Sequence, residues 1–182
     1  MTIDVNRLAV ITWLSENTRG LGRTALMKYC YFLQAVCGVP LGYRFSLYSY
    51  GPFDSDVLSD LDTAESMGGV RSSIVYFPGG YGYRIEPGER SRRVREFGEP
   101  FLETYRQQLQ WVADHFGGWD ASDLEVASTL VYSDREAWRR GEHLTIVGLS
   151  TRVRDLKPRY SISQIESQAE RLARLELFRS IQ

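Results

Sequence analysis

Apolar and polar residues follow two different periods along the first half of the chain. Apolar residues recur at helical spacing over residues 5–15 and, on a broader face, over residues 23–36, which predicts two helices. Gly38-Val39-Pro40 ends the second helix. Residues 43–50 then alternate between apolar and polar types, and this period of two predicts a strand or extended segment.

A third helix and a hairpin follow. Asp54 or Ser55 is suited to cap a helix that ends at a pair of glycines. β-branched and aromatic residues on both sides of a Pro-Gly-Gly turn predict a hairpin formed by residues 74–77 and 81–85. The order helix, helix, short strand, helix and two-stranded hairpin is that of a winged helix, in which the hairpin is the wing.

The second half of the chain has helical patterns. Apolar residues keep helical spacing over residues 94–116, with Pro100 marking a helix start or a kink. Two capping-box patterns, Ser122-Asp123-Leu124-Glu125 and Ser163-Gln164-Ile165-Glu166, predict the starts of two later helices. A further apolar repeat between them predicts a helix that stops before Pro158.

These elements predict an α+β fold that is mostly α. We expect a winged-helix-like region over residues 1–88, with the β-hairpin as its wing, packed on a helical region over residues 89–182. The 182 residues, 43% of them hydrophobic, are enough for one compact unit with a core. The 22 Lys and Arg residues nearly balance the 23 Asp and Glu residues, which argues against coating nucleic acid through overall charge but not against a local basic face.

The two cysteines and the lack of a long apolar run predict a cytoplasmic protein. Cys30 and Cys37 lie in one predicted helix, about 10 Å apart along its axis, which is too far for a disulfide. We expect both to be buried thiols in a reducing compartment. No stretch approaches the roughly 18 apolar residues of a membrane span, so we expect no membrane contact.

Candidate catalytic and metal-binding residues are sparse. His115 and His143 are the only histidines, and neither lies in a metal-ligand pattern, so a structural or surface role is favoured over ligation. In the acidic third helix, the helix dipole explains the carboxylates near the start, and we expect Asp60 and Asp62 to face water. The sequence therefore predicts no enzyme activity, no catalytic residues, no metal and no cofactor.

Aromatic residues gather between residues 43 and 83, and some of them are candidates for contact with a protein partner. Tyrosine is enriched at interfaces because it offers a large, rigid and amphipathic surface. The alternative, in which most of these residues cover the core between hairpin and helices, is equally compatible with the sequence. The candidate partner-binding residues are Tyr48, Tyr50, Phe53 and Tyr81.

Arginines on and after the hairpin form a possible nucleic-acid-binding patch, whose residues are Arg84, Arg92, Arg93 and Arg95. A solvated helix start explains the run over residues 90–95 as well. In a winged helix, the helix before the wing commonly enters the major groove. Here that helix is acidic and has no Lys or Arg, so phosphates would repel it. Arginine supplies nearly all the positive charge of the chain, and Lys28 and Lys157 are its only lysines.

Five segments of the chain are similar in sequence to motifs of one group of proteins. They comprise residues 28–34, 43–45, 48–57, 125–132 and 153–161. Together they resemble the YwgA-like proteins and, more distantly, the Panacea or SocA-like antitoxin domain. The most specific of the shared motifs is Tyr50-Gly51-Pro52-Phe53.

The resemblance implies a binding and regulatory protein. Members of these families with assigned roles neutralise a paired toxin or deliver a toxin to a protease, and some are encoded beside antiviral defence genes. We therefore expect an antitoxin-like regulator, or a subunit of a defence-associated complex, that masks or positions a protein partner encoded nearby. The alternative is a DNA-binding transcriptional regulator of winged-helix type.

Overall fold

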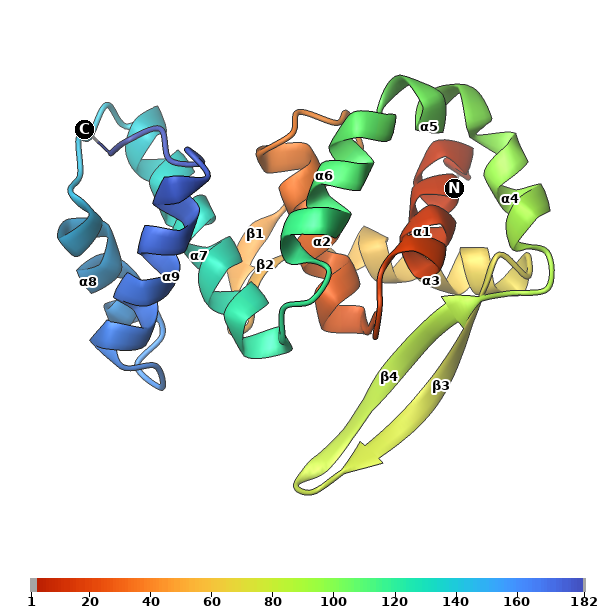
Figure 1. Cartoon of the computed structure of the whole chain (residues 1–182), viewed down its shortest axis with the longest axis horizontal. Helices are drawn as coiled ribbons and strands as arrows, with labels where there is room; N and C mark the ends of the chain where they lie inside the picture. The colour runs from red at the N-terminus through yellow and green to blue at the C-terminus, as the bar shows by residue number, and fades with distance from the viewer. Residues whose placement is uncertain (1–2, 182) are drawn as a thin grey trace. The chain divides into compact units, whose positions relative to one another are not determined.

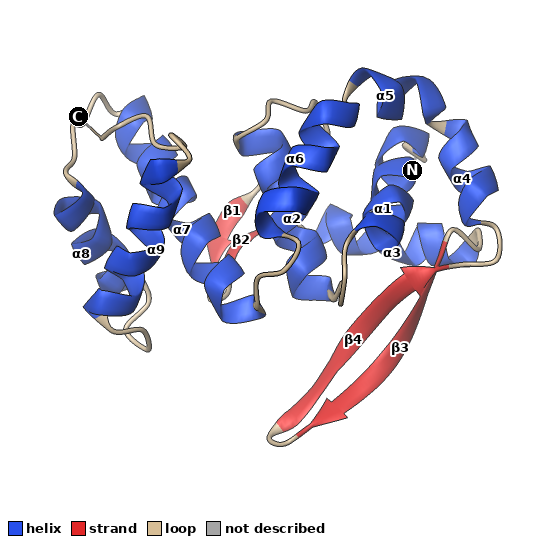
Figure 2. Ribbon diagram, in the orientation of Figure 1, coloured by secondary structure: helices blue, strands red, loops and turns tan. Residues whose placement is uncertain are grey.

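The computed structural model describes residues 3–181 and is mostly helical, with two antiparallel hairpins (Figure 1, Figure 2). The helices are α1 (Val5–Asn17), α2 (Arg23–Ala35), α3 (Ser55–Ser66), α4 (Ser91–Phe97), α5 (Glu99–Thr104), α6 (Arg106–Phe116), α7 (Ala121–Arg139), α8 (Ile146–Leu156) and α9 (Ile162–Arg174). The strands are β1 (Ser46–Tyr48), β2 (Gly51–Phe53), β3 (Val70–Phe77) and β4 (Gly80–Pro87). The expected α+β, mostly α class is confirmed. Across residues 3–181, no helix has both the length and the apolar character needed to cross a membrane.

The chain forms two compact units. Unit 1 comprises Met1–Phe45 and Asp54–Trp119, and unit 2 comprises Ser46–Phe53 and Asp120–Gln182. In the part of the chain that follows α3, unit 1 therefore ends at Trp119, whereas the sequence predicted a boundary near Gly88. The difference arises because α4, α5 and α6 pack on α1, and α6 also packs on α2. Gly88 itself lies inside unit 1, where a Cβ atom would come within 2.3 Å of the Gly68 carbonyl oxygen.

Helix α1 is the centre of unit 1. It contacts α3, α4, α5 and α6 and both strands of the β3–β4 hairpin. The predicted helical face is confirmed, since Leu8, Ile11 and Leu14 are at most 1% exposed. Helix α2 packs on α6, where the rings of Phe32 and Phe116 stack with centroids 4.1 Å apart.

The helical pattern over residues 94–116 belongs to three short helices instead of one. Helix α4 ends and α5 begins at Gly98, where a Cβ atom would lie 2.6 Å from the Cβ of Ala9 on α1. The close approach to α1 therefore requires glycine at this break. Pro100 lies in the first turn of α5, which agrees with the helix start that its position predicted.

The β3–β4 hairpin is anchored at one end and free at the other. The two strands pair along their whole length, which confirms the predicted hairpin and extends it. At the base, Val70 and Ile85 are each 2% exposed, and the Ile85 amide donates to the Leu21 carbonyl at 2.7 Å. Beyond this base, the hairpin projects from the helices of unit 1 (Figure 1).

The predicted strand over residues 43–50 is shorter than expected. Both backbone polar groups of Tyr43 are bonded to the side chain of Gln34, with N–H to Oε1 at 2.9 Å and C=O to Nε2 at 2.8 Å. These bonds keep Tyr43 out of a ladder, and the Arg44 amide donates to Oδ2 of Asp54 instead; β1 begins at Ser46. β1 pairs with β2 in a hairpin of its own, separate from the β3–β4 pair.

Helix α7 is the centre of unit 2, because α8, α9 and β2 all pack on it. The predicted helix starts are displaced by two residues. Asp120 caps α7 by accepting the backbone N–H three residues ahead at 2.8 Å, and Ser161 caps α9 in a capping box with Gln164. Ser122 and Ser163, the predicted caps, therefore lie inside the first helical turns.

Candidate functional site

Two of the four candidate partner-binding residues lie at the end of β1 and on the turn to β2: Tyr48 is the last residue of β1, and Tyr50 lies on the turn. The two residues are 61% and 64% exposed. The turn ends at Gly51, whose φ of 89° is a conformation that favours glycine. Gly51 and Pro52 are buried, and β2 packs on α7. The turn thus has a buried side and a side that presents two tyrosine rings to solvent.

A buried lysine holds this turn in place. Lys157, which is 3% exposed, donates from Nζ to the carbonyl oxygen of Tyr48 at 3.2 Å and to that of Ser49. Its third neighbour is Glu125 on α7, whose Oε1 lies 3.2 Å from Nζ. This contact lacks hydrogen-bond geometry and acts through charge. Two of the three ammonium donors are therefore used on the backbone of the turn.

Glu125 is the second buried charge, at 2% exposed, and three groups share it. Besides Lys157, the guanidinium of Arg159 pairs with its carboxylate, and the phenol of Tyr160 donates to Oε2 at 3.2 Å. Such partners offset part of the desolvation cost of burying a carboxylate. The two cations and one anion leave a single positive charge, and it lies towards Arg159, whose side chain is 49% exposed.

Arg159 connects the buried pair to the exposed rings. Its guanidinium carbon lies 4.9 Å from the ring centroid of Tyr50 and 5.0 Å from that of Tyr160, within the range of cation–π attraction. Burial raises the pKa of the Tyr160 phenol, against hydrogen bonds to Ser122 and Arg159 that lower it. Tyr48, Tyr50, Arg159 and Tyr160 form what we call the tyrosine surface.

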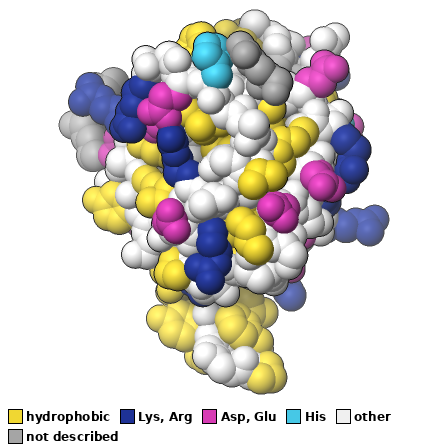
Figure 3. Space-filling model, turned by 90° about the vertical axis from the view of Figure 1, so that its left-hand side faces the viewer, with side chains coloured by type: hydrophobic (Ala, Val, Ile, Leu, Met, Phe, Trp, Pro, Cys, Tyr) yellow, Lys and Arg dark blue, Asp and Glu magenta, His cyan; other side chains and the backbone are white. Residues whose placement is uncertain are grey.

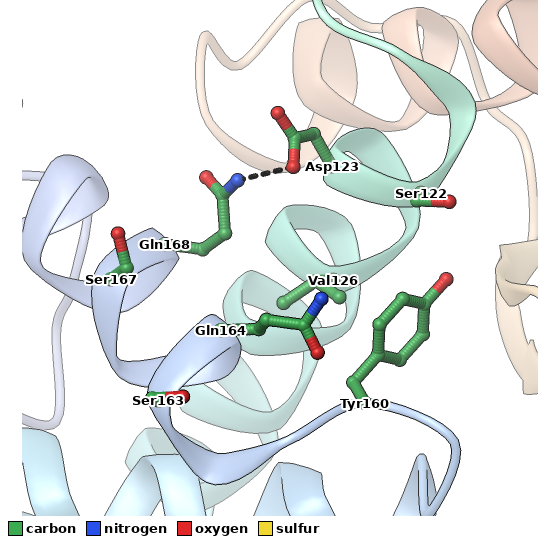
Figure 4. A pocket seen from close by; sticks show the side chains of 8 residues that line it. All are labelled: Ser122, Asp123, Val126, Tyr160, Ser163, Gln164, Ser167 and Gln168. Atoms are coloured by element: carbon green, nitrogen blue, oxygen red, sulfur yellow. Dashed lines mark hydrogen bonds between the residues drawn. The ribbon is translucent and has the colours of Figure 1, made fainter.

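A cavity of about 340 Å³ adjoins Tyr160 between the first two turns of α7 and of α9 (Figure 4). Its lining residues are Ser122, Asp123, Val126, Tyr160, Ser163, Gln164, Ser167 and Gln168. Gln168 donates to Asp123 at 2.6 Å, and Arg171 pairs with the same carboxylate at 3.5 Å. The lining is polar with its one carboxylate already paired, which suits hydrogen bonds to amide groups better than binding of an ion.

The other two candidates have different positions. Phe53 is half-buried, and its ring packs against that of Tyr48 with centroids 5.3 Å apart, so it supports the turn more than it faces solvent. Tyr81 is 60% exposed but lies on β4, in unit 1. The structure thus brings Tyr48, Tyr50 and Phe53 together in unit 2 and places Tyr81 in the other unit.

The four candidate nucleic-acid-binding arginines all lie in unit 1. Arg84 on β4 and Arg93 on α4 are exposed. Arg92 pairs with Glu96 at 3.1 Å, and Arg95 pairs with a glutamate of α1 at 2.8 Å and is only 31% exposed at its side chain. Half of the predicted basic patch is therefore neutralised by carboxylates.

Asp60 does not face water as expected. Its Oδ2 accepts a hydrogen bond from the phenol of Tyr43 at 2.9 Å and lies 3.5 Å from Nη1 of Arg7. The Arg7 Nε donates to the carbonyl of Leu41 at 2.6 Å, so the group ties α1 and α3 to the loop after α2. Burial raises the pKa of the Asp60 carboxyl, against the hydrogen bond from Tyr43 and the charge of Arg7.

Both cysteines are free, as predicted, although only one is fully buried. Burial raises the pKa of Cys30 to about 12 and that of the half-buried Cys37 to about 11. At these values neither thiol is an activated nucleophile. In the part of the chain that the structure describes, no group of three or more His, Cys, Asp or Glu side chains is placed to hold a metal ion.

Sequence reasoning missed Glu125, Lys157, Arg159 and Tyr160 as parts of the site. One signal was available, because an arginine-rich chain with only two lysines uses lysine selectively. Lys28 and Lys157 are both buried, at 2% and 3% exposed. A compact ammonium with three donors suits a site where several backbone carbonyls converge, whereas a planar guanidinium does not.

A search against models of protein families and a search of curated proteins each gave no match to this chain.

Proposed function

We propose that the protein is a non-enzymatic protein-binding regulator, antitoxin-like or a subunit of a defence-associated complex, that masks or positions a partner encoded nearby. The observation that carries the proposal is the pair of exposed rings, Tyr48 and Tyr50, on a turn that Lys157 holds in place. Tyrosines on a fixed backbone lose little conformational entropy when a partner covers them, and such residues are common anchors of interfaces.

The resemblance to YwgA-like proteins supports the same proposal. The segments 48–57, 125–132 and 153–161, which carry part of that resemblance, supply every residue of the tyrosine surface and the Glu125–Lys157 pair beneath it. Residues from these three segments lie together around the exposed rings of Tyr48 and Tyr50. A common binding surface explains this arrangement better than separate packing roles for each segment. A winged-helix-like arrangement of unit 1 remains part of this proposal.

The mechanism we propose is steric masking. The partner would cover Tyr48 and Tyr50, use the positive charge at Arg159, and place polar groups in the cavity beside Tyr160. A stable complex of this kind buries about 800 Å² on each partner. The tyrosine surface would supply the centre of that area and its surroundings would supply the rim.

Purification from the native host, with the neighbouring genes intact, tests this function. The tagged protein is compared with Tyr48→Ala/Tyr50→Ala, and with Tyr76→Ala as a matched control that removes an exposed tyrosine of unit 1. We expect a stoichiometric partner encoded nearby, retained by the control and lost from the double variant, with unchanged helical content in both. A partner retained by the double variant, or no partner at all, would refute the proposal.

The second candidate function is DNA binding, favoured by the exposed Arg84 and Arg93. It predicts an affinity that falls steeply with salt, by about one counterion for each phosphate contact. Arg84→Ala/Arg93→Ala should then reduce both the affinity and the salt slope for a duplex taken from the promoter of its own gene. Binding that is absent at low salt, or that does not respond to salt, would remove this candidate.

A further inference from the structure

The β3–β4 hairpin carries the core face of unit 1 out into solvent. Residues opposite one another in the register share a face, so Ile74, Tyr76 and Tyr81 lie on the same face as the buried Val70 and Ile85. Ile74, Tyr76 and Tyr81 are 51%, 80% and 60% exposed. In Figure 3, hydrophobic side chains gather at the lower end of the view, where the part of the hairpin far from its base lies.

The hydrogen bonds at the base show which backbone groups face outward. The amide of Ser72 donates to Glu65 on α3 at 2.7 Å, and the amide of Ile85, its neighbour in the register, donates to Leu21 at 2.7 Å. Both amides therefore point away from the partner strand. The Gly88 amide, by contrast, donates to the Gly69 carbonyl at 2.9 Å, as expected for the hydrogen-bonded pair beyond the strands.

Antiparallel pairs alternate between bonded and non-bonded along a ladder. Because Ser72 and Ile85 form a non-bonded pair, the next non-bonded pairs are Ile74 with Tyr83 and Tyr76 with Tyr81. The N–H and C=O groups of Ile74 and Tyr76 thus face the outer edge of β3. Within residues 3–181, neither amide has a hydrogen-bond acceptor.

This edge also lacks the features that keep edge strands apart. Residues 72–77, Ser-Ser-Ile-Val-Tyr-Phe, contain no charged residue, no proline and no glycine. Charged residues, prolines and bulges are the usual means of preventing edge-to-edge pairing. A two-stranded sheet is also marginal in water, whereas three or more strands with an apolar face are stable.

We propose that the outer edge of β3 pairs with the same edge of a second copy of this chain, forming a four-stranded antiparallel sheet. A two-fold axis at Val75 places Ile74 opposite Tyr76 of the second copy, and Tyr76 opposite its Ile74. Each of these two pairs exchanges both N–H···O bonds, so the contact has four backbone hydrogen bonds. The apolar faces of the two hairpins become one continuous face.

Other registers are worse. Centring the axis on Ile74 would place Tyr76 opposite Ser72, whose amide is already bonded to Glu65. Centring it on Tyr76 would place Ile74 opposite Pro78, which has no N–H to donate. Only the register centred on Val75 pairs free groups with free groups, so the edge is self-complementary in one register.

The contact is small and forms at high protein concentration. The exposed parts of Ile74, Tyr76 and Tyr81 amount to roughly 350 Å² per copy, since an aromatic side chain carries about 150–250 Å². A standard interface uses about 800 Å² per partner. We therefore expect a reversible dimer whose population follows protein concentration, independent of the tyrosine surface of unit 2.

Sedimentation equilibrium of the full chain from about 5 µM to about 500 µM tests the dimer, because this range suits an interface below standard size. The weight-average mass should rise from the monomer value of 20.9 kDa towards twice that value. Ile74→Pro should hold it at the monomer value, because the proline removes an outward N–H without breaking the hairpin. Ile74→Val, which keeps that N–H, should behave as wild type.

Hydrogen exchange of single amides tests the edge itself. The amides of Ile74 and Tyr76 should exchange at least about tenfold more slowly at high concentration. Those of Ser73 and Val75, already bonded within the hairpin, should not change, and in Ile74→Pro they should remain protected. A monomer at all concentrations, or a dimer in which the Ile74 and Tyr76 amides exchange freely, would overturn the proposal.

Discussion

Removing the ammonium of Lys157 should be one of the most damaging single changes in unit 2. In Lys157→Met, Glu125 keeps Arg159 and the Tyr160 phenol but loses its buried counter-charge at 3.2 Å. The carbonyls of Tyr48 and Ser49 also lose their donor. Removing one partner of a buried ion pair costs about 3–5 kcal/mol.

The remaining contacts place the expected cost at the lower end of that range. Arg159 still compensates part of the Glu125 charge, and the two carbonyls that lose their donor are only part-buried. We therefore expect a loss of about 3 kcal/mol in the free energy of unfolding of unit 2. For a unit of about 70 residues, such a loss lowers the midpoint of thermal unfolding by about 12–24 °C.

A double-mutant cycle separates the ion pair from general damage. Glu125→Gln alone leaves the Lys157 ammonium buried without an anion, and should cost a similar amount. The double variant Glu125→Gln/Lys157→Met buries neither charge, so it should be at least about 2 kcal/mol more stable than the sum of the single effects predicts.

Urea unfolding followed by circular dichroism gives these free energies. Trp138 is the only tryptophan of unit 2, so fluorescence of variants that keep Trp138 and replace the others assigns the transition to that unit. Additive single effects, or a loss below about 1 kcal/mol for Lys157→Met, would show that the pair does not hold the turn.

Three further predictions concern the buried carboxylate of Asp134, the two cysteines and the partly buried carboxylate of Asp60. The carboxylate of Asp134 is fully buried and accepts the amide and hydroxyl of Ser180 at 2.8 and 2.7 Å, so Asp134→Ala should cost about 3 kcal/mol or more and open the C-terminal segment to limited proteolysis. Cys37, with its pKa raised from 9.0 to about 11, should react with iodoacetamide about 100-fold more slowly than a free thiol at neutral pH, and Cys30 only on unfolding, as peptide mass spectrometry can follow. The pKa of Asp60 is raised in the folded state, so the folded protein ionises this carboxyl less readily than the unfolded chain does. The stability of wild type relative to Asp60→Asn should therefore fall as pH rises from the unfolded pKa of about 3.9 through the folded pKa. A stability difference that does not change with pH would contradict this.

Sequence patterns predicted the elements well where one local rule decided them. The apolar face of α1 and the turn of the β3–β4 hairpin follow from spacing and from glycine. Where a contact distant in sequence decided the outcome, the prediction was wrong. Gln34 bonds to both backbone groups of Tyr43, which lies outside the shortened strand, and the close approach of Ala9 on α1 requires glycine at the break between α4 and α5.

The candidate site shows the same limit. Its exposed aromatic residues could be chosen from composition, and Tyr48 and Tyr50 are indeed exposed. The group that fixes them, Lys157, lies 109 residues away from Tyr48, and no local pattern connects the two. Tyr81 is also a tyrosine and is exposed to a similar degree, but it belongs to the other unit. Distance in sequence therefore hid the positioning residues, while residue type revealed the surface.

The most direct test of the account is the dissociation constant for the partner that co-purifies, measured by titration calorimetry for wild type and for Tyr48→Ala/Tyr50→Ala. If the exposed rings anchor the partner, the double variant should bind at least about 30-fold more weakly, which corresponds to about 2 kcal/mol. Arg93→Ala, an exposed change in unit 1, should leave the constant unchanged. Equal affinity for wild type and the double variant would contradict the claim that the tyrosine surface binds a protein partner.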